Sequence, residues 1–362
     1  MRVLQLTSNA ETGGVTTLAG TVAEGLAARG CSVETMSLAG RGGVPGRVLH
    51  LAGIARHILA TRPDAILGYQ PAASLFGGIF GMLAGTRVRA AHQTAIPEAM
   101  RPLWRMLDRW GGRLGLHSHV VANSAATRAA FAAYPRRYRN RIIEIAHGVA
   151  PLPGPAGARD WRADRGIGRE SLMLVATGRL AAQKNHRLAV TALARLRQAH
   201  LVIAGDGPEL RALMRLARRL GVAHRLHLVG SVPRAELGDL LAAADIYLFP
   251  SRWETFGLAA VEAAMAGLPV VAADLPVLRE VLGGLDMDLV RFHAPDDAGS
   301  LAAEVAALAE AGPTPMQQAR LAEAARRRHG AAGMIERYMA LIAADRPAAQ
   351  HQPAPAPSET RP

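Results

Sequence analysis

Residues 250–274 read Pro250-Ser-Arg-Trp-Glu-Thr-Phe-Gly-Leu-Ala-Ala-Val-Glu-Ala-Ala-Met-Ala-Gly-Leu-Pro-Val-Val-Ala-Ala-Asp274 and carry two carboxylates, Glu254 and Glu262. The apolar runs 246–249 and 269–273 on either side are typical of buried strands. A strand, a polar loop, a helix and a second strand form a βαβ unit, in which ligands meet the loop at the carboxyl end of the first strand. The segment therefore predicts an α/β fold with a binding site at that loop.

The same alternation of short apolar runs and longer Ala-, Leu- and Arg-rich segments continues along the chain. Strands are predicted at 3–6, 32–37, 65–68, 88–92, 119–122, 142–145, 172–176, 201–204, 225–229, 246–249, 270–272 and 288–292. This pattern is typical of parallel sheets with helices on both faces. The glycine- and proline-rich segment 148–157 predicts a linker in the middle. The expected fold class is α/β, with two doubly wound parallel-sheet domains facing each other across a cleft.

This division predicts five segments. They are an N-terminal domain at 1–147, the linker at 148–158, a C-terminal domain at 159–330, a helix at 331–346 that crosses back to the N-terminal domain, and a disordered tail at 347–362.

The 362 residues carry a formal net charge of +13, almost entirely from arginine, because Lys184 is the single lysine. A general preference for arginine explains this charge simply, whereas attraction to anionic membranes or substrates is the more specific interpretation. Aromatic residues make up only 4%, so no stacking platform for nucleic acid is expected. Without a signal-peptide pattern or an apolar run of about 18 residues, the chain is expected in the cytoplasm.

Two cations follow the first strand of the C-terminal half, in Thr177-Gly178-Arg179-Leu180-Ala-Ala-Gln-Lys184-Asn185. Arginine offers a planar fork and lysine a compact charge, which together suit two adjacent phosphates. Solvated surface cations are the alternative. We favour a phosphate-binding loop, because the chain keeps its one lysine here.

The carboxylates of Glu254 and Glu262 can accept hydrogen bonds from vicinal sugar hydroxyls. Between them, amides at a predicted helix N-terminus can hold phosphate. They belong to Thr255, Phe256, Gly257 and Leu258. Alternatively, Glu254 is a first-turn acid and Glu262 is solvated. However, Glu262 stands in an almost wholly apolar helix and needs a partner or a ligand.

Three further motifs stand at predicted strand ends. Gly13-Gly14 suits close approach of backbone amides to an anion, and equally a plain tight turn. The residues Gly205-Asp-Gly-Pro at 205–208 are fully explained as a tight turn that leads into a helix, and binding of a ligand by the glycine backbone is the secondary interpretation. His92 would point into the cleft, although a lone histidine is more often a core or solvated residue.

Residues 101–114 mix arginine with Trp, Leu and Met at roughly helical spacing. This fits a helix lying on an anionic membrane. It fits somewhat better an amphipathic helix that packs its apolar face on the core. If the acceptor is a lipid-linked sugar, a basic first half would help the protein to find it.

In this order, the motifs resemble the family 4 retaining glycosyltransferases of the GT-B fold. The resemblance covers nearly the whole chain, and its specific part is the second half. It is carried by Gly-Gly-Val at 13–15, His92, Asn123-Ser124, Gly178-Arg179-Leu180 with Lys184-Asn185, Gly205-Asp206-Gly207-Pro208, and Glu254 with Glu262 followed by Ala266-Gly267-x-Pro269-Val270-Val271. The departures are His147 for the more usual Asn of the linker, Trp253 before Glu254, and Thr255 where glycine is frequent.

The resemblance implies a nucleotide-sugar donor held mainly by the second domain. Arg179 and Lys184 would neutralise its diphosphate, Glu262 would bind the ribose, and Glu254 with the neighbouring amides would hold the donor sugar and phosphate. Gly13 and Gly14 would close on the phosphate, and His92 would lie beside the reacting sugar. The family needs no metal and no cofactor besides the donor substrate. Asp286-Met-Asp288 looks like a metal-binding Asp-x-Asp but is predicted to be a turn.

The implied activity is retaining, metal-independent transfer of a hexose-type sugar to a hydroxyl of a glycan or lipid-linked acceptor. The expected setting is bacterial cell-surface polysaccharide or glycolipid synthesis, with possible peripheral contact at the inner face of the cytoplasmic membrane. A nucleotide-sugar epimerase of the same fold and a non-catalytic nucleotide-sugar-binding protein are the alternatives. Both are disfavoured by the set Arg179, Lys184, Glu254 and Glu262.

Overall fold

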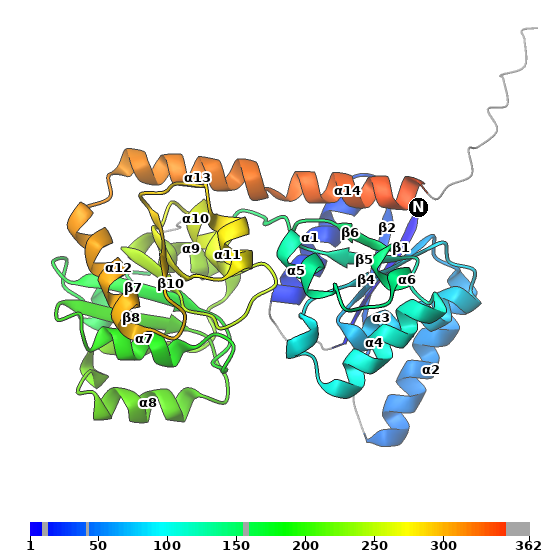
Figure 1. The fold of residues 1–362 in the computed structure, drawn as a ribbon, viewed down its shortest axis with the longest axis horizontal. Helices are drawn as coiled ribbons and strands as arrows, with labels where there is room; N and C mark the ends of the chain where they lie inside the picture. The colour runs from blue at the N-terminus through cyan, green and yellow to red at the C-terminus, as the bar shows by residue number, and fades with distance from the viewer. Residues whose placement is uncertain (9–13, 41–42, 155–158, 345–362) are drawn as a thin grey trace, which may run out of the picture.

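The structure is a computed structural model that describes residues 1–8, 14–40, 43–154 and 159–344 (Figure 1). Gly13 and the tail predicted at 347–362 lie outside the described residues. Two six-stranded sheets, each with helices packed around it, form two domains that lie side by side.

The N-terminal domain holds the first sheet, in the order β2-β1-β3-β4-β5-β6, and every neighbouring pair is parallel. Its strands are β1 (Arg2–Thr7), β2 (Ser32–Ser37), β3 (Ala65–Tyr69), β4 (Val88–His92), β5 (His119–Ala122) and β6 (Ile142–Glu144). Its helices are α1 (Gly14–Ala27), α2 (Val44–Thr61), α3 (Pro71–Leu83), η1 (Pro97–Ala99), α4 (Pro102–Leu114), α5 (Ala125–Ala130) and α6 (Arg136–Arg139). The winding direction reverses between β1 and β3.

The C-terminal domain holds the second parallel sheet, in the order β12-β11-β10-β7-β8-β9. Its strands are β7 (Leu172–Thr177), β8 (Ala199–Ala204), β9 (Leu226–Leu228), β10 (Ile246–Phe249), β11 (Val270–Ala273) and β12 (Val290–His293). Its helices are η2 (Ala163–Arg165), α7 (His186–Leu193), α8 (Leu210–Arg219), η3 (Ala223–Arg225), α9 (Arg234–Ala243), α10 (Leu258–Met265), α11 (Pro276–Leu282), α12 (Ala298–Ala311) and α13 (Pro315–His329). The winding reverses between β7 and β10, which is where ligands bind in such sheets.

The predicted α/β class with two doubly wound parallel sheets is confirmed. The last strand shows how a local contact moves a predicted end. It was predicted from Asp288 but begins at Val290, because Asp286 Oδ1 accepts the amide of Asp288 at 3.0 Å and forms a turn. Arg320 Nε donates to the other oxygen of Asp286 at 3.0 Å. The Asp286-Met-Asp288 segment is therefore a turn, as predicted.

The two domains are connected by two chain crossings that run together. The Val149 amide donates to the His329 carbonyl at 2.8 Å, and Val149 forms a parallel bridge with Gly330. A Cβ on Gly148 would lie 2.5 Å from Ala331 Cα, so this close approach requires glycine. Beyond the crossing, α14 (Ala331–Ala344) packs on α1 of the N-terminal domain. Within the described residues, no helix is both long and apolar enough to cross a membrane.

Candidate functional site

The charged residues predicted in two separate segments meet at the carboxyl ends of β7 and β10, where the C-terminal sheet reverses its winding. Lys184 Nζ donates to Glu254 Oε1 at 2.6 Å, and the side chain of Glu254 is only 8% exposed. Lys184 Nζ also lies 4.7 Å from the centre of the Phe249 ring. Removing one partner of such a buried ion pair is strongly destabilising, because the other charge is left buried without a counter-charge.

Backbone contacts hold the two loops of this site together. The Arg252 amide donates to the Gln183 carbonyl at 2.8 Å, and Gln183 Nε2 donates to the Trp253 carbonyl at 3.1 Å. These bonds explain why residues 70 positions apart, Lys184 and Glu254, reach the same point. Arg179, on the first loop, is exposed and makes no side-chain hydrogen bond or ion pair with another described residue. Its guanidinium is therefore available to an anion.

The start of α10 provides free amides beside this ion pair. Gly257 precedes the helix with φ of 95°, and no side chain caps the helix. The amides of Thr255, Phe256 and Gly257 make no hydrogen bond to a described residue. Unsatisfied amides at a helix N-terminus favour an anion, because the helix dipole adds to their partial positive charge. This arrangement can hold a phosphate next to Lys184.

Glu262 lies on α10, and its side chain is 12% exposed. Arg234 Nη1 donates to its Oε1 at 2.5 Å, while Arg234 Nη2 donates to the Ala150 carbonyl at 2.8 Å. Glu262 thus has the partner that its apolar surroundings require. Burial raises the pKa of the Tyr247 phenol well above its usual value, and the charges of Glu262 and Glu254 add to this. The negative charges of both carboxylates therefore disfavour ionisation of the same buried side chain, Tyr247 of β10.

Gly14 of the N-terminal domain faces this site. A Cβ on Gly14 would lie 3.4 Å from Leu258 Cδ1, so the N-termini of α1 and α10 approach each other across the domain boundary. Gly13 lies outside the described residues. The site is thus bordered by one helix N-terminus from each domain.

Two glycines predicted to bind the donor have structural roles in this fold. The Gly178 amide donates to Ala204 O at 2.9 Å, and the Gly205 amide donates to Gly230 O at 2.7 Å. Neither amide is free for a ligand. A Cβ on Gly205 would come within 2.0 Å of Gly178 O, and both residues have positive φ. The two glycines are needed so that the loops after β7 and β8 can touch.

His92 lies at the predicted strand end, but its side chain is buried, as the core alternative predicted. Its side chain is 2% exposed, Nε2 pairs with Tyr338 Oη of α14 at 2.6 Å, and Nδ1 contacts the Gly68 carbonyl at 3.2 Å. The ring also stacks on Tyr69, with centroids 4.3 Å apart. Burial lowers the pKa of His92 to about 4. The prediction that the ring points into a cleft is wrong for this structure, because α14 covers it.

A contact between the domains reaches the same loop. The hydroxyls of Ser124 and Thr127 at the start of α5 donate to the Thr255 carbonyl at 3.2 and 3.1 Å. Glu280 of α11 accepts the amides of Ala125 and Ala126 at 2.7 and 2.9 Å. Thr127, Glu280 and Arg234 were not predicted from the sequence, because no local pattern marks a residue whose partner lies on the other domain or on the linker.

The helix α4 was predicted to pack its apolar stripe on the core, and this is wrong. The buried residues of α4 are Asp108, Gly111 and Gly112. The exposed apolar residues are Leu103 (57%), Met106 (49%), Trp110 (49%) and Leu114 (65%). Asp108 is held inside by the Tyr138 hydroxyl at 2.9 Å, and burial raises its pKa to about 6. The buried face of α4 thus consists of Asp108 and two glycines, with Trp104 and Leu107 half-buried beside them, and the apolar stripe stays on the surface.

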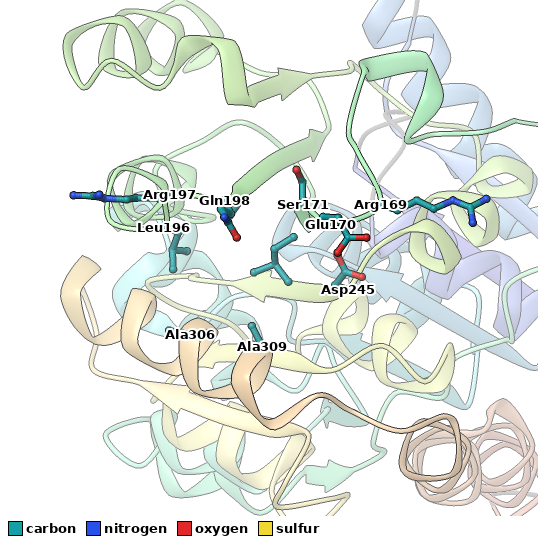
Figure 2. A pocket seen from close by; sticks show the side chains of 11 residues that line it. Arg169, Glu170, Ser171, Leu196, Arg197, Gln198, Asp245, Ala306 and Ala309 are labelled. Carbon is teal, nitrogen blue, oxygen red and sulfur yellow. The ribbon is translucent and has the colours of Figure 1, made fainter.

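A hollow of about 390 Å³ elsewhere on the C-terminal domain is unrelated to this site (Figure 2). Its lining includes Ser171 and Leu172 at the start of β7, Ala199 at the start of β8, and Asp245 just before β10. These are the amino ends of the strands. Ligands of doubly wound sheets bind at the opposite, carboxyl ends.

Two doubly wound parallel-sheet domains side by side are the architecture of the GT-B glycosyltransferase fold. Residues 158–328 match the family model described as glycosyl transferases group 1. HepE of Anabaena in complex with UDP-glucose has the same fold over 95% of this chain and all of that chain, with a TM-score of 0.81 and 20% identity.

Two curated relatives come from Mycobacterium tuberculosis. The chain is 36% identical to a glycogen synthase over 191 residues, which is 52% of this chain and 44% of that protein. It is 27% identical to a GDP-mannose-dependent alpha-(1-6)-phosphatidylinositol dimannoside mannosyltransferase over 271 residues, which is 63% of this chain and 70% of that protein. The chain therefore spans less than half the length of the first relative.

Proposed function

We propose that the chain transfers a hexose from a nucleotide-diphosphate sugar to a hydroxyl of a glycan or lipid-linked acceptor, as a family 4 enzyme. The observation that carries this proposal is the Lys184–Glu254 pair at the winding reversal, beside exposed Arg179 and the free amides before α10. The glycogen synthase and mannosyltransferase names of the relatives support a hexose donor. The setting proposed is bacterial cell-surface polysaccharide or glycolipid synthesis.

The chemistry proposed is substitution with retention, without a metal. The bond between the sugar C1 and the diphosphate oxygen breaks, and its electron pair leaves with the diphosphate. Arg179, Lys184 and the amides of residues 255–257 stabilise the charge that develops there. The acceptor hydroxyl attacks from the same face, and its proton passes to an oxygen of the departing phosphate. This route needs no nucleophile from the protein.

Glu262 is proposed to bind the ribose. Its Oε1 is held by Arg234, while Oε2 makes no hydrogen bond to another described residue. A carboxylate oxygen positioned by arginine can still accept from a hydroxyl. Glu262→Gln should therefore weaken nucleotide binding more than it slows transfer from bound donor, which calorimetry with UDP, GDP or ADP and a single-turnover measurement would separate.

The decisive experiment is a screen of UDP-, GDP- and ADP-sugars for release of free nucleotide by the purified chain. We expect release from at least one donor, no loss of activity with EDTA, and an α-configured product by NMR from an α-configured donor. If no donor is cleaved but nucleotides bind, the chain is a nucleotide-sugar-binding protein. Conversion of one sugar nucleotide into another would instead identify an epimerase.

The exposed stripe of α4 supports an acceptor at a membrane surface. Four exposed apolar residues lie at helical spacing, namely Leu103, Met106, Trp110 and Leu114. Exposed arginines stand beside them, with Arg101 just before the helix and Arg105, Arg109 and Arg113 within it. An apolar stripe bordered by arginine is typical of helices that lie in the interface of an anionic bilayer.

Met106→Ser/Trp110→Ser should lower binding to vesicles containing phosphatidylglycerol at least about tenfold, because two apolar side chains that would be buried in the bilayer are removed. Co-sedimentation measures this. The matched control is Met287→Ser/Met316→Ser, which removes two side chains that are 66% and 79% exposed on the other domain. Equal losses in both variants would contradict a role of α4.

A further inference from the structure

The C-terminal domain carries its own concentration of positive charge, on α7 and α8. Arg187 of α7 and Arg215, Arg218 and Arg219 of α8 line a hollow of about 450 Å³ with Ala212. All four arginines are exposed, and none has a side-chain hydrogen bond or ion pair with another described residue. We call these four residues the arginine hollow.

Helix stability does not explain the arginine hollow. Neither α7 nor α8 contains an acidic residue. Arg215 and Arg219 are four positions apart, a spacing at which like charges destabilise a helix by a few tenths of a kcal/mol. Guanidinium groups that converge on one hollow match the oxygens of phosphate, which they bind through two parallel hydrogen bonds each.

The position of α8 indicates where such phosphates come from. In Figure 1, α8 and α2 lie along the same lower edge of the molecule, and α13 and α14 run along the opposite edge. Helix α2 exposes Val44 (75%), Val48 (59%) and Leu49 (73%), while α8 exposes Leu210 (37%) and Met214 (42%) beside the arginines. The two helices at this edge, one from each domain, thus both carry exposed apolar side chains, and α8 also carries three of the four arginines of the hollow.

We propose that the arginine hollow binds the phosphate groups of anionic membrane lipids, so that both domains rest on the bilayer. This inference rests on the proposed action at a lipid-linked acceptor. On this edge the N-terminal domain contributes apolar contacts through α2, and the C-terminal domain contributes electrostatic contacts through α8. Such a contact weakens steeply with salt, because the Debye length falls to about 3 Å at 1 M.

The test measures partition of the whole purified chain onto vesicles of phosphatidylcholine alone and of phosphatidylcholine with phosphatidylglycerol. Arg215→Gln/Arg219→Gln should weaken binding to the anionic vesicles about thirtyfold, since each arginine near an anionic surface strengthens binding about fivefold. The matched control is Arg327→Gln/Arg337→Gln, which removes the same charge from α13 and α14 on the opposite edge. It should weaken binding less than about threefold.

Equal losses in the two double variants would overturn the proposal, because net charge alone would then explain the binding. The proposal would also be overturned if the Arg215/Arg219 variant bound the vesicles as well as the wild type does. It would likewise fail if the hollow bound inorganic phosphate saturably but the chain did not bind vesicles. Release of nucleotide from the donor without vesicles should be the same in the variant and the wild type. If the wild type cleaves no donor yet the vesicle result holds, the proposed function fails and the lipid contact stands.

Discussion

The two sheets reverse their winding in the same way but carry different chemistry at that point. In the C-terminal domain, the loops after β7 and β10 are joined by a lysine and a glutamate 2.6 Å apart. In the N-terminal domain, the described part of the loop after β1 contacts the start of α3 through neutral groups, since the Ser8 amide donates to Gln70 Oε1 at 3.2 Å and Ser8 Oγ accepts the Ala73 amide at 3.2 Å. Under the proposed function, the charge compensation for a diphosphate would therefore come mainly from the C-terminal domain, through Lys184 and the neighbouring loops.

The largest expected effect comes from removing the charged partner in the C-terminal domain. Lys184→Ala should lower sugar transfer at least about 100-fold, because it removes a cation from the leaving phosphate and leaves Glu254 buried without a partner. Steady-state kinetics with the donor found in the screen measure this. Ser8→Ala, at the same place in the other sheet, should cost less than about threefold. Comparable losses in both variants would remove the distinction between the two domains.

A smaller effect is expected from His147, which stands where the linker leaves the N-terminal domain. Burial lowers its pKa to about 3, and its Nε2 contacts Asn123 Nδ2 at 2.9 Å. The folded state therefore binds this proton less readily than the unfolded state. Stability from His147 is present above pH 6.5 and is lost as pH falls from there toward 3, by about 2 kcal/mol between pH 7.5 and 5.

His147→Asn removes this titration, so its urea-unfolding free energy should fall less between pH 7.5 and 5 than that of the wild type. Asp108 acts in the opposite direction, because its raised pKa gains stability as pH falls below about 6. It is unchanged in both proteins and cancels in the comparison. An identical pH dependence in wild type and variant would show that His147 is charged or exposed in solution.

The smallest effect tests the contact between the domains. Thr127→Val keeps the shape of the side chain and removes its hydroxyl from the Thr255 carbonyl. One neutral hydrogen bond contributes about 1 kcal/mol, so kcat/KM for the donor should fall about fivefold. The control is Thr61→Val, whose hydroxyl bonds only to the His57 carbonyl of its own helix at 2.8 Å. Equal kinetics of both variants would mean that the contact does not position the donor loop.

The C-terminal domain was more predictable than the N-terminal domain for a physical reason. Its site is built from short segments at strand ends, so residue type and spacing alone bring Arg179, Lys184 and Glu254 to one edge of the sheet. In the N-terminal domain, His92 is at the predicted strand end, but α14, more than 200 residues later, covers it and bonds to it through Tyr338. No pattern around residue 92 contains that information.

The sequence by itself determined the parallel α/β architecture, because buried strands and amphipathic helices leave periodic patterns that depend only on near neighbours. It also determined that one lysine and two glutamates belong to a single loop-rich edge. Only the tertiary structure decided which partner each group takes: Arg234 for Glu262, Tyr338 for His92, and the interior rather than solvent for Asp108 of α4. These outcomes depend on packing between distant segments. Such packing decides whether a polar or an apolar face is buried, and no local periodicity in the sequence records it.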